Sequence, residues 1–178
     1  MAYLDVDALN QCVDFTDPKD PRPVLNAIFV VDLPDNKRLY AATTGQIATA
    51  IVKMRADDLP NGCIRIVKYK KMQKKEVGTH ITLDAMQLGQ DYDTAQEWEK
   101  MRGILPKTYG GLCKTEYERA TCYKVFNPDY TKKVLKYAGL NAYTDSGKVY
   151  LGDADDILAP QIWDKGDMFI EIMPMRQW

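Results

Sequence analysis

Phe169-Ile170-Glu171-Ile172-Met173-Pro174-Met175-Arg176-Gln177-Trp178 is an apolar run that stops at a proline. Its composition predicts a strand over residues 168–173. Pro174 has no N–H to donate to a neighbouring strand, so the strand ends before it or lies at a sheet edge. Terminal residues are usually polar and frayed, whereas these include two methionines, an arginine and a tryptophan. We therefore expect this segment to be packed and to contribute to a binding surface.

Further strands are predicted where β-branched and aromatic residues cluster between turn residues. Residues 24–33 and 38–44 flank the turn Pro34-Asp35-Asn36-Lys37, which predicts a hairpin. The remaining predicted strands cover residues 46–54, 63–71, 77–83, 121–126 and 148–152.

A first helix is predicted over residues 4–15. Val6 and Leu9 fall on one face of it, and Asp5 or Asp7 is suited to be its N-cap.

Two further helices are marked by their first residues. Thr94-Ala95-Gln96-Glu97 has the spacing of a capping box, and the helix continues to Met101. Asn127 is suited to be an N-cap with Pro128 at the first helical position, and that helix ends near Gly139. The order of helix, strands, irregular middle, helix and strands predicts an α+β domain built from two similar halves.

Composition and charge exclude several classes of protein. An apolar fraction of 46% and a charged fraction of 28% are ordinary for a globular protein. The net charge of −1 argues against a protein that coats nucleic acid nonspecifically, although a basic face balanced elsewhere is compatible with it. The acidic N-terminus lacks the features of a signal peptide, and no apolar run has the length of a membrane span. We therefore expect a soluble, cytoplasmic protein with no membrane association.

The cysteines do not predict a metal site. Cys12, Cys63, Cys113 and Cys122 show no Cys-x-x-Cys spacing, and the chain has one histidine, His80. Zinc sites need clusters of these residues at short spacing. We expect reduced thiols, no metal and no cofactor.

Three segments carry a family resemblance. Arg22-Pro23-Val24-Leu25-Asn26 leads through the hairpin to Leu39-Tyr40-Ala41-Ala42-Thr43-Thr44-Gly45-Gln46-Ile47-Ala48, and Phe126-Asn127-Pro128-Asp129-Tyr130 precedes Val134-Leu135. The final strand then runs into Met-Pro-Met-Arg. In this order the segments resemble the bacterial DNA polymerase III beta subunit, the sliding clamp, in a divergent single-domain version.

The resemblance implies a fold. It implies one clamp-like domain over residues 1–178, with two helices packed on a curved antiparallel sheet. The matching segments fall within residues 1–54 and 120–178. Residues 56–118 would then be an insertion or an elaborated connection.

The resemblance also implies a function without catalysis. A clamp-like protein would be a processivity or replication-associated factor around double-stranded DNA. Clamp rings contain more domains than this chain supplies, so a homo-oligomer is expected. Pro174, Met175 and Arg176 match the family's pocket for short linear motifs of replication proteins, and methionine suits a surface that accepts varied apolar side chains.

Lysines are the candidate DNA contacts. Several on one face would give salt-dependent, sequence-independent affinity for the phosphate backbone. The alternative is a solvated helix face and a charged edge strand that resists aggregation. The candidates are Lys132, Lys133 and Lys136 on the last helix, and Lys68, Lys70 and Lys71 in the densest basic run.

Two departures from the family favour a second hypothesis. Thr44, Gln46 and Ile47 replace the family's Asp, His and Arg in a loop near the DNA channel. The first helix is acidic, with Asp5, Asp7 and Asp14, whereas a helix lining DNA should be basic. The alternative is a clamp-fold protein-binding module, an adaptor or inhibitor of the kind a phage could encode, that does not encircle DNA.

An enzyme hypothesis is weaker. Asp93, Glu97, Glu99 and Lys100 loosely resemble a metal-dependent nuclease, whose carboxylates must converge on a divalent cation. We favour instead a solvated helix with intrahelical ion pairs. His80 has no nucleophile context and is expected on a surface strand.

Overall fold

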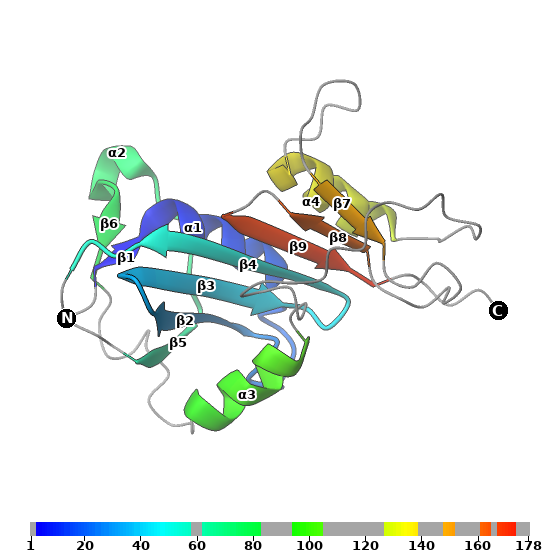
Figure 1. Cartoon of the computed structure of the whole chain (residues 1–178), viewed down its shortest axis with the longest axis horizontal. Helices are drawn as coiled ribbons and strands as arrows, with labels where there is room; N and C mark the ends of the chain where they lie inside the picture. The colour runs from blue at the N-terminus through cyan, green and yellow to red at the C-terminus, as the bar shows by residue number, and fades with distance from the viewer. Residues whose placement is uncertain are drawn as a thin grey trace.

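Antiparallel strands in one sheet organise the protein, whose structure is a computed structural model (Figure 1). The structure describes residues 3–57, 62–82, 94–104, 127–138, 148–151, 161–164 and 167–173. In the seven-stranded sheet the order is β5-β2-β3-β4-β9-β8-β7, and β1 pairs with β6 in a second, two-stranded sheet. The strands are β1 Leu4–Asp5, β2 Ala27–Leu33, β3 Lys37–Thr43, β4 Ile47–Met54, β5 Cys63–Val67, β6 His80–Ile81, β7 Lys148–Leu151, β8 Gln161–Asp164 and β9 Met168–Ile172.

The helices flank this sheet, and the element order repeats. α1 precedes β2, β3 and β4, and α4 precedes β7, β8 and β9. The two groups of strands meet at β4 and β9, so the sheet order is symmetric about that pair, with β5 added beside β2. This agrees with the predicted α+β domain of two similar halves. The helices are α1 Val6–Cys12, the 3₁₀ turn η1 Val13–Phe15, α2 Lys74–Val77, α3 Thr94–Ile104 and α4 Pro128–Ala138.

One side of the sheet, called here the helix face, carries α1 and α4. Tyr40 lies on this side, because its hydroxyl accepts a 2.9 Å hydrogen bond from the N–H of Asp5 at the start of α1. In the register, Tyr40 pairs with Ile51, which pairs with Met168 of β9. All three are buried. The rings of Phe15 and Tyr137 lie 5.6 Å apart and join η1 to α4.

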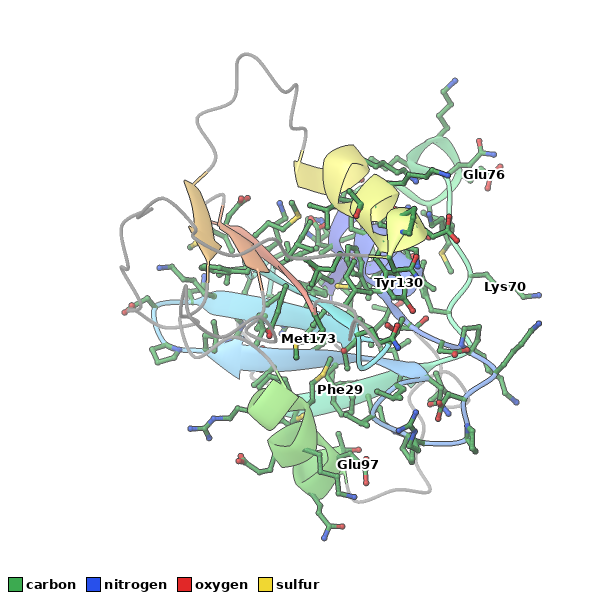
Figure 2. All side chains as sticks on the ribbon, turned by 90° about the vertical axis from the view of Figure 1, so that its right-hand side faces the viewer. Phe29, Lys70, Glu76, Glu97, Tyr130 and Met173 are labelled. Carbon is green, nitrogen blue, oxygen red and sulfur yellow. The ribbon has the colours of Figure 1, made fainter. Side chains whose placement is uncertain are left out.

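The opposite face carries α3. Phe29 points to this side, and its ring lies 6.1 Å from that of Trp98. Figure 2 shows Glu97 of α3 and Tyr130 of α4 on opposite sides of the strands. The sheet is therefore a middle layer between α3 on one side and the pair α1 and α4 on the other.

The predicted first helix is confirmed, with Asp5 as its N-cap. Asp5 Oδ1 accepts a 2.8 Å hydrogen bond from the N–H of Ala8. Val6 and Leu9 are fully buried, as the periodicity predicts. The thiol of Cys12 is also buried, which raises its pKa.

A buried arginine fixes the start of the chain to β3. Arg38 is 1% exposed, and it donates to Asp32 at 2.8 Å, to the carbonyl of Tyr3 at 2.8 Å and to Asp57 at 3.1 Å. Desolvation alone would raise the pKa of Asp57, but hydrogen bonds from Arg38 and from the Tyr3 N–H hold that pKa below its ordinary value. Charged partners in this geometry satisfy the buried guanidinium.

Several predictions for the middle of the chain are wrong in detail. The strand predicted over 63–71 ends at Val67, because Lys68 has a φ of 53°. The strand predicted over 77–83 is only His80–Ile81, preceded by the unpredicted helix α2. Strand β8 was also not predicted. The strand predicted over 121–126 lies outside the described residues.

Glu171 is a buried acidic residue on the face of the sheet away from α1 and α4. It pairs with Ala48 of β4 and Ile162 of β8, and it is 7% exposed. Its Oε2 has no hydrogen-bond partner among the described residues. Burial raises the pKa of this carboxyl to about 7.

The raised pKa predicts a pH-dependent stability. The folded state holds the proton of Glu171 between its ordinary pKa of 4.5 and about 7, whereas the unfolded state releases it. The stability that this group contributes is complete below pH 4.5 and is lost as pH rises through 7. Glu171→Gln should remove this dependence, which amounts to at most about 3 kcal/mol. Urea unfolding of both proteins from pH 4.5 to 8 measures it.

Glu99→Gln on α3 is the control, because the Glu99 side chain is 65% exposed. It should retain the pH dependence of the wild type. Parallel stability curves for Glu171→Gln and wild type would contradict the prediction.

Candidate nucleic-acid interface

Helix α4 presents the three predicted lysines at different depths. Its start is fixed as predicted, because Asn127 Oδ1 accepts a 2.9 Å hydrogen bond from the Asp129 N–H. Val134 is buried on the side that faces the sheet. Lys132 and Lys136 are exposed, whereas Lys133 is half-buried.

The basic run forms a segment that lies along α1, which we call the lysine strap (residues 68–77). Asn10 of α1 holds it. The Asn10 amide donates to the Met72 carbonyl at 2.8 Å, and its oxygen accepts from the Met72 N–H at 3.0 Å. The hydroxyl of Tyr69 also donates to Asn10, at 3.1 Å. The Asn10 side chain thus bonds the backbone of the strap much as a neighbouring strand would. The strap in turn covers the polar side of α1.

Ion pairs reinforce this attachment at both ends of α1. Lys74 contacts Asp7 near the start of the helix. Lys71 contacts Asp14, in η1 after the helix, at 2.5 Å. Two of the three acidic residues that argued against DNA binding, Asp7 and Asp14, are therefore partners of strap lysines, and the third, Asp5, caps α1. On this side of the molecule, strap lysines therefore lie against the acidic residues of α1 and η1.

Asp14 is also where the strap meets α4. Besides Lys71, its carboxylate lies 3.4 Å from Lys136 Nζ and accepts a hydrogen bond from the Tyr137 hydroxyl. Lys133 Nζ donates to the Asp14 backbone carbonyl at 2.6 Å. Three of the predicted lysines, from segments far apart in the sequence, therefore converge on one residue that sequence reasoning did not select as a binding residue.

The other predicted lysines extend into solvent around this cluster. Lys68 and Lys70 are exposed on the strap, and Figure 2 shows Lys70 pointing away from the sheet. Lys132 is exposed on α4, 3.7 Å from Asp129. The helix face therefore has an inner group of lysines that contact Asp14 and an outer group that does not.

The structure describes the residues next to the predicted peptide pocket but not the pocket residues themselves. Pro174, Met175 and Arg176 lie outside the described ranges. Met173, just before them, is 39% exposed, and its N–H donates to the Gln46 carbonyl at 2.8 Å. The loop at 43–47 thus lies beside the end of β9. Gly45 has a φ of 86° there, a conformation that glycine adopts without strain.

The structure describes only some of the residues that suggested a nuclease. Glu97 was expected on a solvated face, yet it is 3% exposed and pairs with Lys100 at 2.6 Å. His80 lies in the short strand β6, beside the hydroxyl of Thr79. In the ranges the structure describes, no three His, Cys, Asp or Glu side chains gather as a metal site would require. Asp93 lies outside these ranges.

The described part of the chain bears on two other predictions. Cys12 and Cys63 are free thiols there. Burial raises the pKa of Cys63 to about 11. No described helix has both the length and the apolar character needed to cross a membrane. Cys113 and Cys122 lie outside the described ranges.

Removing the Asn10 side chain should release the strap. Asn10→Ala deletes its three hydrogen bonds to Met72 and Tyr69, and each is worth about 1 kcal/mol. Trypsin cleavage after Lys70 and Lys71 should then be at least about tenfold faster under native conditions, because it follows local opening. Mass spectrometry of the timed digest measures the cleavage rates.

Gln11→Ala is the matched control, since Gln11 is the next position on α1 and has no described hydrogen bond to the strap. Its cleavage should match wild type. Equal cleavage of wild type and both variants would show that Asn10 does not hold the strap.

No protein-family model and no curated protein matches the chain. Among solved structures it is similar to the DNA polymerase III subunit beta from Pseudomonas aeruginosa, with a TM-score of 0.50 and 14% identity over 98% of this chain and 65% of that chain. Matches at a TM-score of 0.47 include the beta sliding clamp of C. crescentus (12% identity, 99% of this chain, 66% of that chain) and the beta subunit of Thermotoga maritima (11%, 99% and 65%). The chain thus spans just under two thirds of the length of the Pseudomonas protein. At this identity the Pseudomonas match shows that the fold is clamp-like.

Proposed function

We propose that the chain is a non-catalytic, clamp-like protein that associates with double-stranded DNA through its helix face. It would serve as a processivity or replication-associated factor. The observation that carries the proposal is the placement of lysines from the strap and from α4 on the same side of one sheet. Lysines on one surface bind the phosphate backbone independently of sequence. The likeness in fold to a bacterial clamp supports this reading.

The rest of the proposal concerns assembly and partners. Residues 1–178 form one clamp-like domain, with 56–118 as its insertion. Copies of the chain assemble around DNA in the cytoplasm. The edge strands β5 and β7 of the described sheet are suited to assembly, because an unpaired edge can pair with another chain. Replication proteins bind through short linear motifs at Pro174, Met175 and Arg176, next to the exposed Met173.

One observation favours the second candidate function, a clamp-fold protein-binding module that does not encircle DNA. The contacts of Lys71, Lys133 and Lys136 with Asp14 occupy inner lysines within the protein. A module of this kind would bind a protein partner and show weak, nonspecific affinity for DNA.

The DNA proposal predicts a change in salt dependence. Lys70→Gln combined with Lys132→Gln removes one exposed charge from the strap and one from α4. The slope of log K against log salt should fall in magnitude by about 1.8, since each lost phosphate contact reduces it by about 0.9. Fluorescence anisotropy with a labelled duplex between 50 and 200 mM salt measures this slope.

Lys19→Gln combined with Lys37→Gln is the charge-matched control, because both lysines are exposed and belong to neither the strap nor α4. An equal change in both double variants, or no change in either, would contradict the interface. Retention on closed circular DNA, with loss after linearisation, then separates encirclement from simple binding.

A further inference from the structure

Two lysine ammonium groups and a tyrosine hydroxyl surround the Asp14 carboxylate, as such donors would surround a bound anion. Its Oδ2 is contacted by Lys71 Nζ at 2.5 Å, by Lys136 Nζ at 3.4 Å and by the Tyr137 hydroxyl. The Lys71 ammonium also reaches the Tyr137 hydroxyl, at 3.4 Å. The donors thus surround a single oxygen from two separate elements, the strap and α4.

The two donors on α4, Lys136 and Tyr137, have further contacts besides the carboxylate. Lys136 Nζ lies 4.8 Å from the centre of the Tyr137 ring, a cation–π contact. The Tyr137 ring packs against Phe15. Lys133 bonds the backbone carbonyl of Asp14, so it anchors η1 to α4 whatever the Asp14 side chain is. A change of the Asp14 side chain therefore leaves η1 attached to α4, and Lys71 still has the Tyr137 hydroxyl within reach.

The cluster is also open to solvent. The side chains of Lys71 and Lys136 are 45% and 62% exposed, and that of Asp14 is 23% exposed. An external anion can therefore approach the same donors. Phosphate oxygens accept charge-assisted hydrogen bonds from lysine and tyrosine, as a carboxylate does.

We propose that Lys71, Lys136 and Tyr137 form a phosphate-binding subsite of the helix face, in which the Asp14 carboxylate takes the place of a DNA phosphate. This rests on the proposed function. Asp14 then keeps inner lysines from contributing to DNA affinity, and only the outer group contacts the backbone. Weak contact suits a protein held on DNA by encirclement, because strong phosphate contacts would slow its movement along the duplex.

Asp7 provides a comparison within the same helix. It is an acidic residue of α1 in contact with one strap lysine, Lys74. Asp7→Asn and Asp14→Asn change the net charge equally, so a difference between them isolates the cluster around Asp14.

The test measures duplex DNA affinity and its salt dependence for wild type, Asp7→Asn and Asp14→Asn. Asp14→Asn should bind at least about tenfold more tightly than Asp7→Asn near 100 mM salt. Its slope should steepen by about 1.8, because Lys71 and Lys136 become free to contact phosphates. Circular dichroism melting confirms that each variant is folded.

A second variant keeps the test informative if Asp14→Asn unfolds. With Asp14 present, Lys71→Gln combined with Lys136→Gln should change the salt slope by less than about 0.5, since both lysines are already paired with the Asp14 carboxylate. A loss as large as that of an exposed lysine pair would overturn the subsite.

The two proposals fail in different ways. If wild type binds DNA and Asp14→Asn behaves like Asp7→Asn, the subsite is wrong and the proposed function stands. If neither wild type nor Asp14→Asn binds DNA, both are wrong, because the freed lysines then have no affinity for a phosphate backbone.

Discussion

The pairing of β4 with β9 is the constraint on which the rest of the structure depends. Ile47 to Ile51 pair with Ile172 to Met168, and the buried Thr49 hydroxyl donates to the Phe169 carbonyl at 3.0 Å, 120 residues away in sequence. This register puts Ile170 and Ile172 on the helix face. A shift of one residue would move them to the other face and bring Glu171 under α4. The pairing therefore places α4 beside α1 and lets residues of the two halves meet at Asp14.

That meeting explains how an acidic first helix is compatible with a basic surface. Asp5 caps α1, Asp7 pairs with Lys74, and Asp14 gathers lysines from the strap and α4. Each acid thus has a structural partner, and the lysines that remain exposed define what a ligand meets. The nearly neutral net charge of −1 does not reveal this separation between lysines that contact Asp14 and lysines that do not.

Sequence patterns predicted the parts of the fold that local chemistry determines. Apolar and β-branched runs located β2, β3, β4 and β9, and Asn127 with Pro128 located the start of α4. They failed where a single backbone angle or a long-range contact decides. Lys68 adopts a positive φ that ends β5, and Glu97 is buried on a helix that looked solvated. The lysines were predicted as binding residues because they cluster in the sequence. Asn10 and Asp14 could not be predicted in this way, because their partners lie between 57 and 123 residues away in sequence.

The account's central claim is that the side of the sheet carrying α1, the strap and α4 meets DNA. Lysine labelling tests it most directly: a limiting amine-reactive reagent is applied with and without a saturating duplex, and the labelling of each lysine is measured by mass spectrometry. DNA should protect Lys68, Lys70 and Lys132, whereas Lys19 and Lys37 should label equally in both conditions. Equal labelling of all these lysines with and without DNA, or protection confined to Lys19 and Lys37, would contradict it.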